Sequence, residues 1–459
     1  MTTIPGPTTL LGRFASEWSA KPLPAAVADK AAMVLLDGIG LALLAEHERT
    51  ACAARAIAAP SDDPTRSAHV WVDGARAGLA DAVLANSVAV HAQFHDDSEM
   101  NSWSHPGSFI LPVAVGLGEA TDAPLSRVLN GIAVGYGAVS WVGARERVAI
   151  AMIERGIRTS PTLGTIGAAA TACAVLGLST EQAVNAIGMS ACVTGGTLEP
   201  VGSGSDEWRL QVGHAARGGL AAAQLASRGV LGAPQGLEGR KGLARALAGL
   251  EQTPPEWATP PAIEDILGAV AKPYATLGDN MPVVTAAKLL YDAGVDHRRI
   301  RRIVVSFWRQ FVEYPGTAFN GPFERLVQAL ASTTFSASAM LVHGELEFDK
   351  PQDHRDDPEI LRLVPLVEIL PIDDCGPHFA EVMVELVDGT RLVRSAADAP
   401  RTLLHHDRPT ATALIENRMM SSGRAAGHGT RIAETVYAAV DGRAAMSTRE
   451  FVRLATERT

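Results

Sequence analysis

One short stretch of the chain, residues 88–112, brings together the side chains most often used for proton transfer. It reads VAVHAQFHDDSEMNSWSHPGSFILP and contains three histidines and two adjacent carboxylates: His91, His95, His105, Asp96 and Asp97. Histidine and carboxylate groups are the common general acids and bases of enzymes. Ala-rich apolar sequence flanks the stretch on both sides, so its polar groups must either hydrogen-bond to one another or face a cavity. Both interpretations make it the first place to look for chemistry.

The charge and the cysteines exclude several classes of protein. The 459 residues carry a formal net charge of −10 without a Lys/Arg run that could follow a phosphate backbone, so nucleic acid is not expected as a partner. The four cysteines are scattered, which argues against a zinc or iron–sulfur site and favours reduced thiols. The N-terminus lacks the pattern of a signal peptide, and no apolar run is long and uninterrupted enough to span a membrane. We expect a cytoplasmic protein with no membrane partner.

Helices should position the polar stretch. Apolar residues recur at three- and four-residue spacing over residues 8–46, 75–93 and 108–121, and small residues recur every few positions over 126–143. Residues 161–229 continue in this style, with Ser179 or Thr180 as an N-cap ahead of Glu181 and Gln182. With aromatic residues at only 5%, this composition favours close-packed helices over a β-sandwich or barrel.

The pattern changes after about residue 255, where the proline-rich segment TPPEWATPPA forms a linker. Residues 301–308 and 380–389 alternate and carry β-branched residues, which predicts strands. The second ends in Asp388-Gly389, a hairpin turn signal, and residues 390–396 follow as its partner strand. Helices are expected at 282–293 and 323–343, and the tail from about residue 406 returns to helix. The sequence therefore predicts a mainly α protein in which a large all-α domain is joined to a smaller α+β domain.

Seven segments in order make the chain resemble the MmgE/PrpD superfamily, whose members include dehydratases, a decarboxylase and an epimerase. They are LLDGIGLALLA, ANSVAVHAQFHDD with HPGSFILPVAVGLGEA, SPTLGTIGAAATACAVLGLSTEQAVNAIGMSA, VGHAARGGLAAAQLASRGVLGAP, LEGRKGL, AKPYATLGDNMPVVTAAKLL and FDKPQDHRDDPEI. The resemblance implies an all-α domain over residues 1–270, completed by the tail 400–459, and an inserted α+β lid domain over residues 271–399. It also implies a homodimer, a site between the domains, and no metal or other cofactor. The shared chemistry of the family is proton transfer at carbon next to a carboxylate, so the implied ligand is a small organic acid.

The resemblance assigns roles within the polar stretch. Asp96 and Asp97 match the family's carboxylate pair. Because adjacent side chains point in different directions, we expect one to line the site and the other to cap a helix or bind arginine. His105 matches the acid/base histidine, with a backbone-bonded loop histidine as the alternative. Ser98 stands where the family commonly has threonine and is expected to bind a substrate carboxylate. His91 is expected to be structural, and His95 is a candidate additional base.

Further candidates lie outside that stretch. Lys272 matches the family's KPY lysine and is expected to pair with a substrate carboxylate, with a surface lysine as the alternative. Tyr274 beside it is either a proton donor or a packed aromatic. Arg240 and Lys241 lie in a segment that the family places near the site entrance, with a solvated basic turn as the alternative.

Several positions depart from the family's pattern and change the expected pocket. Arg158 replaces a histidine, Trp208 a lysine and Gln211 a second histidine, and Phe94 stands at an acidic position; the family's lid tyrosine aligns with Ala318. Arg158 and Arg209 could restore some positive charge, so both, together with Trp208, are counted among the substrate-binding candidates. The sequence therefore predicts a more apolar pocket and a substrate with fewer carboxylates than a tricarboxylate, or one of a different shape.

The residues leave three functions open. The first is a cofactor-independent lyase, of dehydratase or decarboxylase type, in which His105 or a carboxylate removes a proton alpha to a carboxylate or carbonyl. Lys272 and Arg158 would stabilise the resulting enolate. The second is an isomerase or epimerase that returns a proton to the opposite face, with His95 and Tyr274 as the second pair of acid/base groups. The third is a repurposed, non-catalytic member that binds a metabolite.

Overall fold

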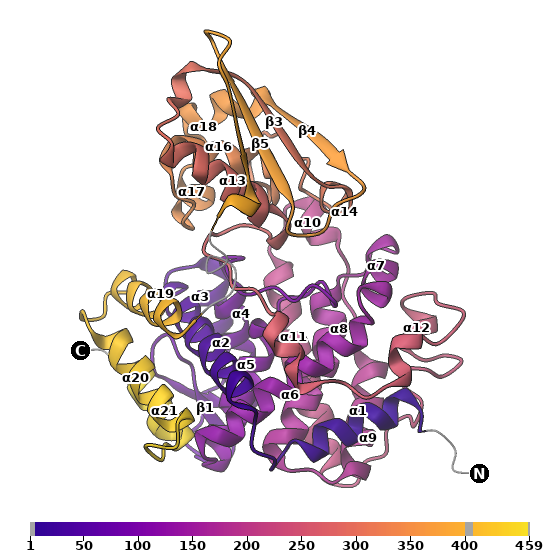
Figure 1. The fold of residues 1–459 in the computed structure, drawn as a ribbon. Helices are drawn as coiled ribbons and strands as arrows, with labels where there is room; N and C mark the ends of the chain where they lie inside the picture. The colour runs from indigo at the N-terminus through magenta and orange to yellow at the C-terminus, as the bar shows by residue number, and fades with distance from the viewer. Residues whose placement is uncertain (1–4, 400–406, 458–459) are drawn as a thin grey trace.

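The computed structural model describes residues 5–399 and 407–457, so residues 400–406 and 458–459 of the predicted tail lie outside the described residues. Helices dominate and the sheets are small, which confirms a mainly α fold with a smaller α+β part. Figure 1 shows the α+β part above a larger helical body. The boundaries at 270/271 and 399/400 stay predictions, although the hydrophobic contacts described below divide the chain in a similar way.

The helical body contains a short two-stranded sheet and helices from both ends of the chain. Its N-terminal helices are α1 (Pro7–Glu17), α2 (Ala25–Leu44), α3 (Arg49–Ala56), α4 (Leu79–His91), α5 (Gly107–Thr121), α6 (Leu125–Gly143), α7 (Arg147–Glu154), α8 (Thr159–Leu176), α9 (Thr180–Val193), α10 (Glu199–Ser203), α11 (Glu207–Ala226) and α12 (Leu243–Ala246). Its C-terminal helices are α19 (Arg408–Ser421), α20 (His428–Val440) and α21 (Thr448–Thr456). Strands β1 (Ser67–His69) and β2 (Arg76–Gly78) pair antiparallel, so the start of the helix expected over residues 75–93 is a strand instead.

Helix α8 lies at the centre of this body, against α5, α6, α9 and α11. Small residues allow the close approach: a Cβ added at Gly219 of α11 would lie 2.5 Å from the Ala168 Cβ of α8. Helix α8 is also the one helix among the described residues that is long and apolar enough to cross a bilayer, and 94% of it is buried inside the molecule. Ser179 caps α9 by accepting from the Gln182 backbone, which confirms the N-cap prediction.

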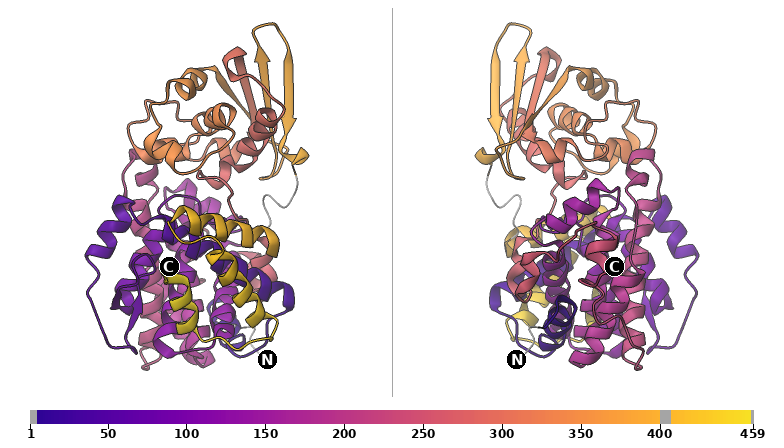
Figure 2. Two further views of the ribbon diagram at one scale, coloured as in Figure 1. Left: turned by 90° about the vertical axis from the view of Figure 1, so that its left-hand side faces the viewer. Right: turned by 90° about the vertical axis from the view of Figure 1, so that its right-hand side faces the viewer.

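The C-terminal helices complete this body rather than extending the upper part. Helix α19 packs on α2, and α21 packs on α5 and α6. Ile415, Met419 and Phe451 belong to the same hydrophobic cluster as residues of α2, α5 and α8. Figure 2 shows these yellow helices lying against the indigo N-terminal ones. Segments more than 350 residues apart in sequence thus share one core.

The α+β region is built on a four-stranded sheet of order β4-β3-β5-β6. Its strands are β3 (Ile300–Trp308), β4 (Val367–Ile372), β5 (Ala380–Leu386) and β6 (Arg391–Ser395). Its helices are α13 (Met281–Asp292), α14 (Arg309–Val312), α15 (Leu326–Ala331), α16 (Thr333–His343), α17 (Asp349–Asp353) and α18 (Pro358–Leu363). Figure 2 shows the helices gathered on one face of the sheet. A second hydrophobic cluster lies between them, formed by residues 283–386.

The predicted strands and the hairpin are confirmed, with Gly389 at φ +86° in the turn. Two predictions in this region were incomplete. Strand β4 was missed, and the helix expected over 323–343 is two helices, because Ser332 is extended (φ −71°, ψ 121°) and caps α16 by accepting from the Phe335 backbone.

Candidate functional site

The polar stretch forms the loop between α4 and α5, residues 92–106, called the polar loop below. Backbone hydrogen bonds of 2.8 Å in both directions join Ser98 to Val270, where the chain leaves the helical body. Phe94 and Trp103 have positive φ values, 56° and 47°, a conformation that costs bulky side chains energy and that the surrounding structure must enforce. The loop is therefore held in one strained conformation at the junction of the two parts of the molecule.

A small cavity opens where this loop meets the α+β region. Ser98, Trp103 and His105 contribute one wall, and Asp279 and Tyr314 contribute the other. The remaining lining residues are Glu99, Met100, Ser104, Leu277 and Gly278. Its volume of about 30 Å³ is room for water and is too small for an organic acid. The two walls must therefore separate before a substrate of that size can enter.

His105 is fixed as a proton acceptor in this cavity. Its Nδ1–H donates to the carbonyl oxygen of Asp97 at 2.9 Å, and the Ser98 hydroxyl lies 3.4 Å from the same nitrogen. Nε2 is therefore the nitrogen with a free lone pair. Burial, followed by the positive charge of Lys272, lowers the pKa of His105 well below its usual value. The ring is neutral at pH 7 and can accept a proton.

The adjacent carboxylates have different partners. Asp97 accepts from the Gly107 backbone at 2.9 Å and from the Tyr136 hydroxyl at 2.5 Å, so it caps the start of α5. Burial raises its pKa to about 7. Asp96 accepts at one oxygen from His91 Nδ1 at 2.8 Å, and its other oxygen is buried without a hydrogen bond. Burial raises the pKa of Asp96, while the positive charge of Lys272 opposes that rise.

The guanidinium group of Arg158 is hydrogen-bonded to other groups of the protein. Its guanidinium donates to His91 Nε2 at 2.7 Å, to the Trp208 carbonyl at 2.5 Å and to Gln211 Oε1 at 3.1 Å. His91 therefore connects Asp96 to Arg158 and holds both in place, which fits the structural role expected for it. Arg158 is buried and does not line the cavity described above. Its position behind the cavity wall, rather than a lack of N–H groups, keeps it from a ligand in that cavity in this structure.

Lys272 is buried directly behind the cavity. Its ammonium group donates to the Phe94 carbonyl and, at 3.2 Å, to the Thr276 carbonyl, and it lies 5.3 Å from the centre of the Phe94 ring. Burial lowers its pKa to about 8, and the charges of Asp96 and Asp97 oppose this shift. The alternative of a surface lysine is wrong, because the side chain is fully buried. Lys272 affects His105 and Asp96 through its charge rather than through direct contact with the cavity.

An aromatic cluster fills the space beside Lys272. The rings of Phe94 and Trp208 lie 4.4 Å apart, and Trp208 lies 5.0 Å from His91. Trp208 is fully buried and does not line the cavity. The apolar character predicted from these two residues is present, but as a packed wall behind the cavity.

The structure places several other candidates away from His105. His95 opens onto a separate cavity of about 470 Å³, also lined by Arg418, and neither of its ring nitrogens has a well-formed hydrogen bond. Tyr274 packs against the hydrophobic cluster of the α+β region. Arg209 donates to the Ala92 carbonyl and pairs with Asp206 at 3.2 Å.

Three remaining positions lie on the surface. Arg240 and Lys241 are exposed next to α12, which Figure 1 shows at the edge of the helical body away from the α+β region. Ala318, where the lid tyrosine was expected, is exposed as well. None of the three lines the cavity.

The sequence reasoning missed Asp279 and Tyr314. Burial raises the pKa of Asp279 to about 7 and that of Tyr314 to about 12. Asp279 lies in AKPYATLGDN, part of a segment that carries the family resemblance, and Tyr314 is four residues before Ala318 in YPGTAFNGPF. A signal for Tyr314 was therefore present, because it is the tyrosine of the segment in which the lid tyrosine was sought.

We expect Asp279→Asn to flatten the pH dependence of stability. The pKa of Asp279 is raised from 3.8 to about 7 in the folded protein, so the folded state holds a proton that the unfolded state has lost between these pH values. The free energy of unfolding therefore falls as pH rises through that window, and the variant lacks this contribution. Urea unfolding at pH 4.5, 6 and 8 measures the difference.

Asp388 provides a matched control, because its pKa is shifted in the opposite direction. The pKa of Asp388 is lowered to about 2 by hydrogen bonds from Thr390, so its stabilising contribution is present above pH 4 and is lost as pH falls towards 2. Asp388→Asn should leave the slope between pH 4.5 and 8 as in the unsubstituted protein. Equal slopes for the Asp279→Asn variant and the unsubstituted protein would contradict the raised pKa of Asp279.

Comparison with known proteins agrees with this architecture. Residues 9–256 match the MmgE/PrpD N-terminal domain. The chain is 27% identical over 374 residues to the cis-aconitate decarboxylase-like protein oryM of Aspergillus oryzae, and the alignment covers 76% of each chain. It is 26% identical over 230 residues to the cis-aconitate decarboxylase of Aspergillus terreus, which covers 49% of this chain and 46% of that one. Because the matched domain spans more than half of its length, the chain belongs to the MmgE/PrpD family.

Proposed function

We propose that the protein is a cofactor-independent lyase in which Nε2 of His105 removes a proton alpha to a carboxylate or carbonyl of a small organic acid. One observation carries the proposal: a neutral histidine lines the inter-domain cavity with Nδ1 committed to the Asp97 carbonyl, which leaves Nε2 as the acceptor. The similarity to proteins named as cis-aconitate decarboxylases supports lyase chemistry at the level of the family.

Charge around the cavity indicates how the enolate would be stabilised. The hydroxyls of Ser98 and Tyr314 lie in the cavity wall and can donate to an anionic oxygen. Lys272 adds positive charge from behind the loop, where it is held by the Phe94 carbonyl. Collapse of the enolate would then expel a leaving group, with its bonding electron pair, from the neighbouring carbon. In a decarboxylation, loss of carbon dioxide would itself leave the electron pair of the broken C–C bond in the enolate, which a protonated group of the site would then protonate at carbon.

The substrate that we propose carries fewer carboxylates than a tricarboxylate. Arg158 lies outside the His105 cavity, where it donates three hydrogen bonds within the protein, and among the described residues no lysine or arginine lines that cavity. A substrate with three carboxylates would bring three negative charges into a partly desolvated site where the one nearby cation, Lys272, lies behind the wall.

An epimerase or isomerase is the second candidate, and a specific observation favours it. Asp279 and Tyr314 reach the cavity from the α+β region, whereas His105 reaches it from the helical body. Acid/base groups on two walls are what deprotonation on one face and reprotonation on the other require. This pair takes the place of His95 and Tyr274, which lie elsewhere.

Proton NMR in deuterated water tests the proposal. The purified protein is incubated with cis-aconitate, 2-methylcitrate, hydroxy- and amino-dicarboxylates, and their monocarboxylate analogues. A lyase gives a new alkene signal or loss of a carboxylate, whereas an epimerase gives deuterium at the alpha position without elimination. A folded protein that leaves every compound unchanged, yet is stabilised by one of them, would favour a metabolite-binding member over either enzyme. The cytoplasmic location and the homodimer stay predictions.

A further inference from the structure

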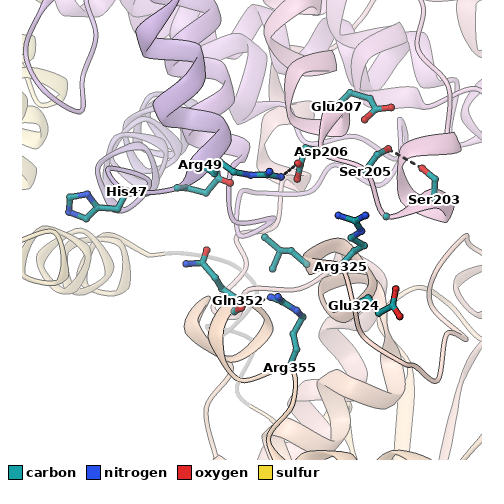
Figure 3. Close-up of a pocket in the computed structure, with 13 residues that line it drawn as sticks. His47, Arg49, Ser203, Ser205, Asp206, Glu207, Glu324, Arg325, Gln352 and Arg355 are labelled. Atoms are coloured by element: carbon teal, nitrogen blue, oxygen red, sulfur yellow. Dashed lines mark hydrogen bonds and ion pairs between the residues drawn. The ribbon is translucent and has the colours of Figure 1, made fainter.

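A third cavity, of about 760 Å³, lies between the helical body and the α+β region. Figure 3 shows its lining: His47 and Arg49 at the start of α3, Ser203 to Glu207 between α10 and α11, and Glu324, Arg325, Gln352 and Arg355 from the α+β region. None of its lining residues belongs to the His105 cavity. Neither the sequence patterns nor the family match assigns a role to it.

Arg325 is held in this cavity by the helical body. Gly204 has φ +77°, and a Cβ added there would lie 2.9 Å from both Cβ and Cγ of Arg325. The glycine thus allows the side-chain stem of Arg325 to pack directly on the loop between α10 and α11. Among the described residues, no carboxylate lies within 4.0 Å of its guanidinium nitrogens.

Arg355 is fixed by its own segment. Its Nη1 donates to the Pro351 carbonyl at 2.8 Å and to the Gln352 carbonyl, at the end of α17. These bonds hold the guanidinium while leaving its other N–H groups free for a ligand. The part of the chain that the structure describes gives Arg355 no ion pair. Two positioned guanidinium groups thus share one cavity without a counter-charge on either.

The acidic residues of the lining do not supply that counter-charge. Asp206 pairs with Arg49 and, at 3.2 Å, with Arg209, and Glu48 lies 3.7 Å from Arg209. In Figure 3 the carboxylates of Glu207 and Glu324 point away from Arg355. The hydroxyl of Ser203 donates to the Glu199 carbonyl at 2.9 Å and accepts from Ser205 at 2.9 Å, so both serines, on the wall opposite Arg355, use their protons within the protein.

We propose that this cavity binds a small oxyanion of two or more negative charges, a polycarboxylate or a phosphate compound, between Arg325 and Arg355. The planar guanidinium group matches the geometry of both kinds of oxyanion. Such a ligand would lie between the two parts of the molecule, because residues of both line the cavity. This cavity is separate from the proton-transfer site. The hydrophobic cluster containing Trp208, Leu326 and Val327 packs beside the cavity and contributes to that separation.

Isothermal titration calorimetry with tricarballylate and with inorganic pyrophosphate tests the inference and separates the two sources of negative charge. We expect saturable binding of one of them that Arg325→Gln or Arg355→Gln weakens at least tenfold. Arg298→Gln, which removes an exposed arginine elsewhere in the α+β region, should change the affinity less than twofold.

Two further measurements distinguish specific anion binding at this cavity from other effects. His105→Ala should bind the same anion with unchanged affinity, so that this site and the proposed catalytic site fail independently. Binding should persist when sodium chloride is added at matched ionic strength. The salt screens non-specific attraction between charges, so binding that persists comes from the site itself. The inference is overturned if neither anion binds saturably, or if the arginine variants bind as tightly as Arg298→Gln.

Discussion

Replacing His105 with glutamine is expected to lower kcat/KM by a factor of roughly 10²–10⁴, the usual contribution of a positioned general base. Glutamine retains a donor for the Asp97 carbonyl, which His105 reaches at 2.9 Å, but it offers no nitrogen lone pair for the substrate proton. Steady-state kinetics on the substrate found by NMR measures the loss. Deuterium exchange at the alpha position should fall by the same factor, because both depend on the same proton transfer.

The same substitution at an exposed histidine provides the control. His354 of the α+β region has a side chain that is 52% exposed, and His354→Gln should leave kcat/KM within about twofold. If His105→Gln keeps the rate of the unsubstituted protein, the base is another group of the cavity, and Asp279 becomes the first alternative. The Tm of His105→Gln separates a structural effect from a chemical one. A lowered Tm would attribute the loss of rate to lost folding, and an unchanged Tm would attribute it to the missing base.

Replacing Arg418 with methionine is expected to destabilise the protein by about 3–5 kcal/mol, the usual result of removing one partner of a buried ion pair. Arg418 of α19 donates to Asp37 of α2, and the side chains are only 5% and 6% exposed. The variant leaves the buried Asp37 carboxylate without its ion-pair partner. Chemical denaturation gives the free energy of unfolding, with the slope checked for two-state behaviour.

The same helix offers a matched control. Arg408 of α19 pairs with Asp29 and Asp441 at the surface, with a side chain that is 31% exposed, so Arg408→Met should cost no more than about 1 kcal/mol. The double variant Asp37→Asn with Arg418→Met should regain part of the lost stability, because the unpaired charge is gone. Equal losses for Arg418→Met and Arg408→Met would show that burial of the pair contributes nothing.

Local pattern was sufficient for most of the helices and failed where the structure depends on distant pairing. Helix α8 and the β5–β6 hairpin follow from apolar spacing and from the Asp388-Gly389 turn. Strand β4 pairs parallel with β3, more than 60 residues earlier, and contains Pro371 near its end. No short-range signal announces such a strand, and its proline, which an edge strand tolerates, argues against a strand in the interior of a sheet.

The residues of the candidate site also divide into those that local sequence predicts and those that depend on distant packing. His105 and Ser98 lie in one contiguous stretch, so their chemistry could be seen without a structure. Asp279 and Tyr314 reach the same cavity only through the packing of the α+β region on the polar loop. The commitment of Arg158 to His91 and Trp208 depends on side-chain geometry that no spacing encodes. Residue type therefore predicted which groups are present, but not which remain available to a ligand.

The contribution of α19–α21 to the helical body has a consequence for biosynthesis. A ribosome delivers α2 first and must translate the whole sheet region before α19 emerges with the partner of Asp37. Until then the growing polypeptide exposes the apolar face that Ile415, Met419 and Phe451 later cover. A nascent chain halted within the sheet region would thus be a natural client for chaperones.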